Sequence, residues 1–125
     1  MYNLNRQPIH KVKSRIYIAK RTGYIQDEEL NQYETFGTPV KYYFNVQTVS
    51  SDSDIREFGE NANSMKCISI PEKNRYINRF NEFDRVYINT TPEDELYNGD
   101  NADYYIYSVR NQNTSILIYI RKIVK

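Results

Sequence analysis

The sequence predicts a mostly β protein, a small antiparallel β-barrel of about six strands with one short helix. The chain has 13 tyrosines and many Ile and Asn but few Ala, Leu or Gly, a composition that favours pleated sheets. Short segments of alternating apolar and polar residues recur along it, separated by turn-forming residues. A chain of 125 residues normally forms one domain, so we expect a single barrel over residues 12–123 that follows an extended arm over residues 1–11.

Six segments carry the strand pattern. The clearest is Val40–Gln47, in which Val40, Tyr42, Phe44 and Val46 alternate with residues expected on the opposite, solvent-facing side of the strand. Residues 12–18 alternate in the same way. The other strands are expected at 65–70, 85–89, 104–110 and 115–123. The turn over 111–114 joins the last two as a β-hairpin, and the turn over 81–84 introduces the fourth strand.

One short helix is expected between the second and third strands, within Ser50–Gly59. Asp52 and Asp54 suit the positive N-terminal end of a helix, and the final glycine can end it. Ile55 and Phe58 are three residues apart, so both are expected to pack against the core.

Residues 22–39 predict a long loop after the first strand, because Gly23, Gly37 and Pro39 interrupt the pattern. A helical turn over 28–33 or a protruding hairpin is the alternative. Long loops in compact domains commonly bind a partner. The candidate partner contacts in this segment are Tyr24, Asp27, Glu28, Tyr33 and Phe36. A second exposed, acidic loop is expected over residues 90–103.

The net charge of +1 gives no global field that would attract nucleic acid or an anionic membrane. Positive and negative charges are nevertheless separated along the chain, because every charged residue before Asp27 is basic and acids gather at 27–29, 52–60 and 93–95. Separated signs suit a head-to-tail assembly, in which the basic arm of one subunit lies against the acidic edge of the next. The alternative is a solvated, dipolar surface. The candidate basic contacts are Arg6, Lys11, Lys13 and Arg15.

No catalytic, metal or cofactor site is predicted. The one histidine, His10, lies in the arm, and Cys67 lies in an apolar strand with no adjacent histidine, as expected of a small core residue. One cysteine and one histidine cannot supply a four-ligand zinc site. Asp52-x-Asp54 resembles the start of a calcium loop but lacks the third ligand and the glycine.

The composition also bears on membranes and nucleic acids. No long apolar run or secretory signal is present, so no membrane association is expected. A small nucleic-acid-binding barrel is the rival function of another class, because residues 13–17 interleave basic and aromatic side chains. The nearly neutral net charge offers such a function only a modest number of phosphate contacts.

Residues 42–47 (Tyr-Tyr-Phe-Asn-Val-Gln) and 51–59 (Ser-Asp-Ser-Asp-Ile-Arg-Glu-Phe-Gly) resemble the head-closure proteins of long-tailed bacteriophages, also called stopper or head-tail joining proteins. In that family, an extended segment with an Asn-hydrophobic pair leads to a short helix that ends in aromatic-Gly. Residues 84–87 are similar to the family's Asp-x-Val strand, and residues 102–109 to its late strand. Thr48 stands where many relatives carry proline, and the 90–103 loop is long and acidic.

The resemblance implies a virion protein of the phage neck, present in the host cytoplasm during assembly. Copies would form a ring that retains packaged DNA and docks the tail, and would contact the portal or adaptor ring and a tail-terminator or tail protein, with non-specific DNA contact. A neck adaptor or tail-terminator subunit is the alternative. The matching residues would be structural: Asn45 and Asp54 shaping the strand-to-helix turn, Phe58 packing, Gly59 ending the helix, and Asp84 beginning its strand.

Overall fold

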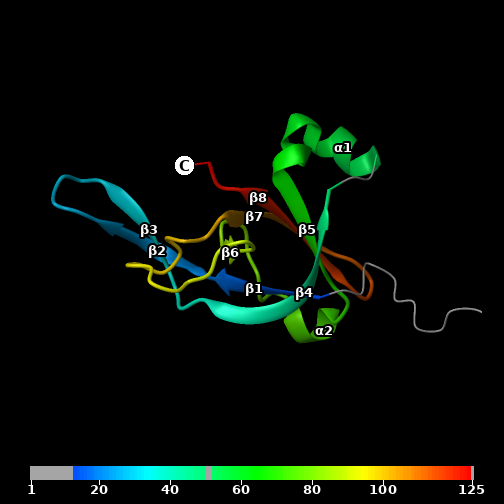
Figure 1. Cartoon of the computed structure of the whole chain (residues 1–125), viewed down its shortest axis with the longest axis horizontal. Coiled ribbons are helices and arrows are strands. Elements are labelled where there is room, and N and C mark those ends of the chain that lie inside the picture. The colour runs from blue at the N-terminus through cyan, green and yellow to red at the C-terminus, as the bar shows by residue number, and fades with distance from the viewer. Residues whose placement is uncertain (1–12, 50–51, 125) are drawn as a thin grey trace, which may run out of the picture.

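The structure is a computed structural model that describes residues 13–49 and 52–124. Six antiparallel strands close into a barrel (Figure 1). Around the barrel they are β1 (Ser14–Ala19), β4 (Val40–Thr48), β5 (Met65–Ile70), β8 (Ile116–Lys122), β7 (Tyr104–Asn111) and β6 (Arg85–Tyr87). Strand β1 pairs with both β4 and β6, which closes the ring. The predicted mostly β barrel is therefore confirmed.

The barrel interior is filled by the apolar members of the alternating strands. In β8, Ile116, Ile118 and Ile120 are buried in the main core, whereas Tyr119 packs in a separate cluster on the outer side. The main core contains Ile16, Ile18, Phe44, Ile68, Ile70, Phe80, Val86, Tyr104, Ile106, Ile116, Ile118 and Ile120. A filled barrel of this kind has no internal channel, so any binding site must lie on its outside or at its ends.

The helix α1 (Asp52–Phe58) forms where the sequence predicts one, and a 3-10 helix (Gly59–Ser64) continues it. Gly59 ends the α-helix in the left-handed region, with φ of 58°. Phe58 is 8% exposed and packs against Tyr119, as expected. The expectation for Ile55 is wrong, because that side chain is 47% exposed. A helix of seven residues presents only one narrow face to the barrel, and Phe58 occupies it.

Asn45 lies before the end of the strand, and its predicted role in the turn that leads to the helix stays a prediction, since residues 50–51 lie outside the described residues. It is buried within β4 opposite Ser69, because β4 continues to Thr48 while pairing with β5. Asp54 lies in α1, where its carboxylate accepts a hydrogen bond from the Tyr119 hydroxyl at 3.1 Å. Asp54 therefore links the helix to the outside of the barrel.

A second short helix, α2 (Lys73–Tyr76), was not predicted. Tyr76 and Phe80, which follows it, form a cluster of aromatic rings with Tyr42 and Phe44. Four residues are too few to show a helical repeat in the sequence. The cluster belongs to the main core and extends it beneath α2.

Residues 22–39 are not a long loop. They contain most of a hairpin, β2 (Arg21–Gln26) and β3 (Gln32–Phe36), which is the alternative that the sequence left open. The hairpin projects from the barrel, away from α1 (Figure 1). Most of its side chains are exposed on both faces, so the apolar alternation that marks a half-buried strand is missing.

The remaining expectations concern loops and termini. Residues 90–103 form a loop without strands, and Gln112 N–H donates to Ser115 C=O at 2.8 Å in the turn between β7 and β8. The predicted arm, residues 1–11, lies outside the described residues. Over residues 13–49 and 52–124, no helix has the length and apolar character needed to cross a membrane.

The packing of α1 generates the first prediction. Phe58→Ala should lower the free energy of unfolding by about 3 kcal/mol, because it removes a buried ring that contacts Tyr119 and Tyr107. Ile55→Ala is the matched control on the same helix, and its exposed position predicts a change within about 0.5 kcal/mol. Urea unfolding of both variants measures the two values. Equal effects would show that Phe58 does not hold the helix to the barrel.

Candidate binding surface

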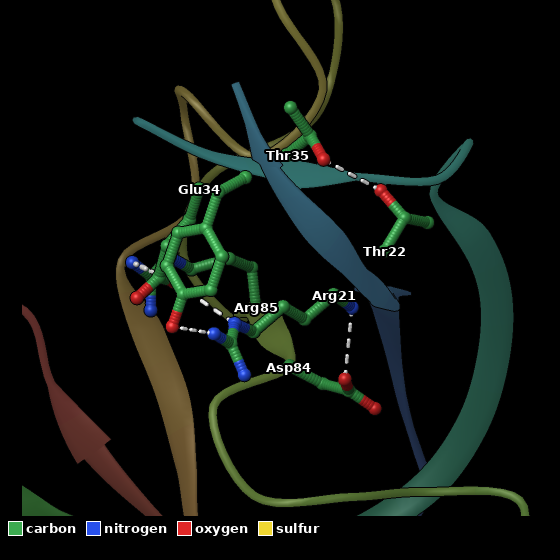
Figure 2. A network of polar contacts seen from close by, with 7 residues as sticks. Arg21, Thr22, Glu34, Thr35, Asp84 and Arg85 are labelled. Carbon is green, nitrogen blue, oxygen red and sulfur yellow. Dashed lines mark hydrogen bonds and ion pairs between the residues drawn. The ribbon is translucent and has the colours of Figure 1, made fainter. Parts of the chain in front are cut away.

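The hairpin is joined to the barrel by a buried carboxylate. Asp84, at the start of β6, is 2% exposed. One of its oxygens accepts from the backbone N–H of Arg21 at 2.9 Å (Figure 2). The other accepts from the N–H of Asn81 at 3.1 Å. Its backbone carbonyl also accepts from Ile106 N–H at 2.8 Å. Asp84 therefore ties the first residue of β2 to the turn before β6 and to β7.

Charged side chains reinforce the same junction. The Glu34 carboxylate of β3 lies 3.8 Å from Arg21 Nε and 3.5 Å from the Arg85 guanidinium of β6 (Figure 2). The Arg85 guanidinium also lies over the Phe36 ring, 4.8 Å from its centre. The Thr22 and Thr35 hydroxyls bond across the hairpin at 2.8 Å. These contacts join both hairpin strands to each other and to the barrel wall.

The 90–103 loop lies against this junction and is held by hydrogen bonds to buried Tyr87 and to the partly buried side chains Glu95 and Asp103. The Tyr87 hydroxyl donates to the Glu95 carboxylate, 2.8–2.9 Å away, and accepts from Gly99 N–H at 2.8 Å. The Asp103 carboxylate accepts from the N–H groups of Ile88 and Asn89 at 2.8 and 3.0 Å. The loop is thus fixed at its start, middle and end by hydrogen bonds to acidic side chains and to one tyrosine.

The loop and the hairpin touch at Gly99. Its φ is 93°, and a Cβ atom there would lie 2.8 Å from Phe36 Cδ2, so only glycine allows this approach. The Asn98 side-chain amide also donates to the Phe36 carbonyl at 3.3 Å. Phe36 therefore belongs to the base of the hairpin, where it is partly buried, rather than to a projecting tip.

A groove with a volume of about 920 Å³ lies between the hairpin and the loop. From the loop, Tyr97, Gly99 and Ala102 line it, and from the barrel side Arg85 and Ile123 do so. The hairpin contributes Ile25, Gln26, Asp27, Gln32, Tyr33, Glu34, Thr35 and Phe36. The size and the mixture of apolar and charged walls are typical of a site that binds a peptide segment or a small molecule.

The tip of the hairpin is acidic and internally ordered. The Asp27 carboxylate accepts from the N–H groups of Glu29 and Asn31, both at 2.9 Å, and from the Tyr33 hydroxyl at 3.1 Å. The Asn31 N–H is the main reason that the pKa of Asp27 lies below its ordinary value. Leu30 has a φ of 69° in the turn and is 74% exposed. The tip therefore presents a negatively charged turn with one exposed apolar side chain.

The structure brings together some of the predicted contact residues. Asp27, Tyr33 and Phe36 line the groove, and Glu28 is exposed beside Asp27. Tyr24 pairs with Glu34 and lies on the opposite face of the hairpin from Ile25 and Tyr33. Lys13 and Arg15 are exposed near the start of β1, which leads to the hairpin at its other end. Arg6 and Lys11 lie outside the described residues.

Other residues of this surface were not found from the sequence. Arg85 looked like an ordinary strand residue, and Ile25 and Leu30 were not distinguished from the polar residues around them. Leu96 and Tyr97 are 81% and 68% exposed in the loop. In the sequence, this adjacent apolar and aromatic pair within an acidic loop was the one signal that the loop contributes to the surface.

The groups suited to covalent or metal chemistry are not gathered at the groove. Burial is the main cause that raises the pKa of the Cys67 thiol to about 12, so it is protonated at neutral pH. Among residues 13–49 and 52–124, no three His, Cys, Asp or Glu side chains are arranged to hold a metal ion.

Comparison with known proteins bears on the fold. No family model and no curated protein matches this chain. The structure is similar to the solution structure of protein SF1141 from Shigella flexneri 2a, with a TM-score of 0.62 over 95% of this chain and 99% of that chain. The two sequences are 21% identical, so the similarity shows a shared fold alone.

The buried carboxylate generates a prediction on stability. Asp84→Asn keeps the shape of the side chain but replaces one accepting oxygen with an amide nitrogen, which cannot accept from Arg21 or Asn81. We expect the free energy of unfolding to fall by about 1–3 kcal/mol. Urea unfolding measures it, and an unchanged value would show that the anchoring hydrogen bonds contribute nothing.

The same variant predicts a pH dependence. Burial is the main cause that raises the pKa of Asp84 above its ordinary value of 3.8, so between the two pKa values the folded protein binds more protons than the unfolded chain. The stability contributed by Asp84 is therefore fully present below pH 3.8 and decreases as pH rises through the folded-state pKa. The deficit of Asp84→Asn should accordingly be largest at low pH. A deficit that grows with pH would contradict the raised pKa.

The loop generates a third prediction. Tyr87→Phe removes the hydroxyl that donates to Glu95 and accepts from Gly99 N–H, so it breaks the hydrogen bonds that hold the middle of the loop. We expect a loss of about 1–3 kcal/mol in the free energy of unfolding, together with faster amide exchange at Gly99 and Asn101. Amide exchange in β5 and β8, away from the loop, is the internal control. Uniform acceleration would mean that the hydroxyl stabilises the whole barrel rather than the loop.

Proposed function

We propose that this protein is a structural subunit of the bacteriophage neck, the head-closure protein that forms a ring beneath the portal, retains packaged DNA and provides the platform for the tail. The observation that carries the proposal is the projecting hairpin. It is held firmly at its base by Asp84 and Glu34 and carries exposed apolar side chains toward its far end, among them Tyr24, Ile25, Leu30 and Tyr33. Exposed apolar side chains grouped on one projecting element favour a contact with another protein.

The charge of the hairpin supports a protein neighbour over DNA as its partner. Asp27, Glu28, Glu29 and Glu34 are acidic, and residues 22–36 contain no lysine or arginine. A segment of this charge is repelled by phosphates and attracted by a basic protein surface. In a closure ring, this hairpin would therefore contact an adjacent subunit or ring, and DNA would meet other parts of the protein.

The specific place in the neck rests on the resemblance of residues 42–59, 84–87 and 102–109 to head-closure proteins. Their positions in the fold agree with structural roles: Phe58 packs the helix to the barrel, Gly59 ends it, and Asp84 anchors the hairpin. A neck adaptor or tail-terminator subunit would share the same kind of contact and differ in the ring that it meets.

Co-sedimentation with DNA-filled, tailless phage heads tests the proposal. We expect the purified protein to bind the heads and to prevent loss of their DNA. Binding to free tails instead of heads would assign the protein to the tail-terminator role. No binding to either particle would overturn the neck assignment.

The hairpin itself provides the fourth prediction. Replacing residues 25–33 with Asn-Gly leaves Tyr24 and Glu34 paired across a two-residue turn and preserves the Glu34 contact with Arg85. We expect an intact barrel, shown by unchanged amide signals from β5 and β8, with binding to heads reduced at least about 100-fold, which is roughly 3 kcal/mol. The control is Ile77→Ala, an exposed apolar side chain beside α2, which should bind normally. Normal binding by the shortened hairpin would remove it from the interface.

The outer surface of β1 and β4 favours one function of another class, a small nucleic-acid-binding barrel. Arg15 lies opposite Tyr43, and Lys41 Nζ lies 5.9 Å from the centre of the Tyr43 ring. Basic and aromatic side chains on adjacent strands can hold a single strand of DNA. Salt-sensitive binding of bare DNA that is lost in Arg15→Glu, together with no binding to heads, would favour this function over the neck role.

A further inference from the structure

The groove runs along the outer edge of β3. Residues 32–36 all line it, although alternate side chains of a strand point to opposite faces. Five consecutive lining residues therefore indicate that the groove reaches the outer edge of β3 as well as the hairpin face that carries Ile25 and Tyr33.

That edge is free in the part of the chain that the structure describes. Strand β3 pairs there with β2 and with no other strand. An unpaired edge presents a row of N–H and C=O groups that can bond to an added strand. Tyr97, on the loop, forms the opposite wall, and the contact between Phe36 and Gly99 closes the groove near the barrel. The geometry fits an extended peptide of a few residues.

The charge of the groove indicates which kind of peptide it can bind. Its charged lining residues are Asp27, Glu34 and Asp100 against Arg85, and Glu28 and Glu29 lie next to it at the tip. Ile25, Tyr33 and Tyr97 add exposed apolar surface. A complementary peptide would be basic, would carry apolar side chains, and would have a stretch without proline, because each paired residue must offer its N–H group.

Residues 1–12 of this chain have that chemistry. They contain Arg6 and Lys11 and no acidic residue. Tyr2 and Leu4 are two residues apart, so an extended strand would place them on one face, and Pro8 follows this stretch rather than interrupting it. At about 3.3 Å per residue, twelve extended residues span about 40 Å.

The position of this segment favours a second molecule over the same one. It joins β1 at Ser14, whereas the hairpin begins at Arg21, just after β1 ends at Ala19. Residues 1–12 and the groove are therefore attached to opposite ends of one strand. A basic segment at one end and an acidic groove at the other are complementary between successive copies in a head-to-tail series.

We propose that residues 1–12 of one copy occupy the groove of the next copy and add a strand to the edge of β3. This contact rests on the proposed function, since it is a way in which the closure subunits would join within their ring. In an extended strand Tyr2, Leu4 and Arg6 share one face, so Tyr2 and Leu4 would pack on Tyr33 and Tyr97 while Arg6 meets the acidic side chains of the groove. Lys11, beyond Pro8, would add positive charge beside the groove.

Two full-length variants, each lacking one half of the contact, test the proposal. The arm variant combines Leu4→Asp with Arg6→Glu and keeps the groove. The groove variant combines Ile25→Arg with Tyr97→Ala and keeps the arm, and both of its positions are exposed, so the fold is preserved. The matched control for the groove variant makes the same kinds of change, Ile77→Arg with Tyr43→Ala, at two exposed positions on the barrel that do not line the groove.

Sedimentation velocity measures the result. The wild-type protein and the matched control should associate with increasing concentration, and each groove or arm variant alone should associate at least about tenfold more weakly. A mixture of the two variants should form a heterodimer and nothing larger, because only one productive contact remains. No heterodimer would overturn the proposal, as would wild-type association by either variant alone.

A peptide titration covers the case in which the contact is weak in solution. A synthetic peptide of residues 1–12, added to the ¹⁵N-labelled arm variant, should shift the amide signals of residues 32–36 and 97–100. The same peptide with Leu4→Asp and Arg6→Glu should not. Shifts elsewhere, or none, would overturn the proposal. These outcomes are separate from the co-sedimentation with heads, because a neck subunit could bind heads while joining its copies through another surface.

Discussion

Asp84 is the side chain on which the geometry of the candidate surface depends. A two-stranded hairpin is marginally stable by itself and would have no fixed direction without a tertiary contact. The Asp84 carboxylate bonds to the first residue of β2 and to the turn before β6, while its own carbonyl bonds to β7. The direction in which the hairpin leaves the barrel is therefore set by one buried acid that three segments share.

The groove depends on this anchor and on the polar interior of the 90–103 loop. Hydrogen bonds with Tyr87, Glu95 and Asp103 hold the backbone of that loop. Without them its backbone groups would have few hydrogen-bond partners, because the loop contains no helix or strand. The loop then meets the hairpin where Gly99 allows close approach to Phe36. Both walls of the groove are thus fixed before any partner binds, which lowers the ordering cost of binding.

The distribution of charge and exposed apolar surface relates this geometry to assembly. The barrel interior is filled, so its strands act as a support that separates the hairpin from the start of β1. Acidic and apolar side chains lie at one end, and basic side chains such as Lys13 and Arg15 lie at the other. A subunit with two unlike ends can join copies in series, as a closure ring requires. Under the proposed function, the hairpin contacts a neighbouring subunit and the barrel supports the hairpin.

The sequence by itself determined the barrel strands, because Ile16, Ile18, Phe44 and the isoleucines of β8 alternate with the period of a half-buried strand. It also determined the end of α1, since Gly59 suits the left-handed turn there. Only the tertiary structure decided the exposure of Ile55, the path of the β2–β3 hairpin, and the contact of Phe36 with Gly99. The physical reason is that a local pattern records burial against a single core, whereas the hairpin is exposed on both faces and its position depends on contacts such as Arg21 with Asp84, 63 residues apart in the chain.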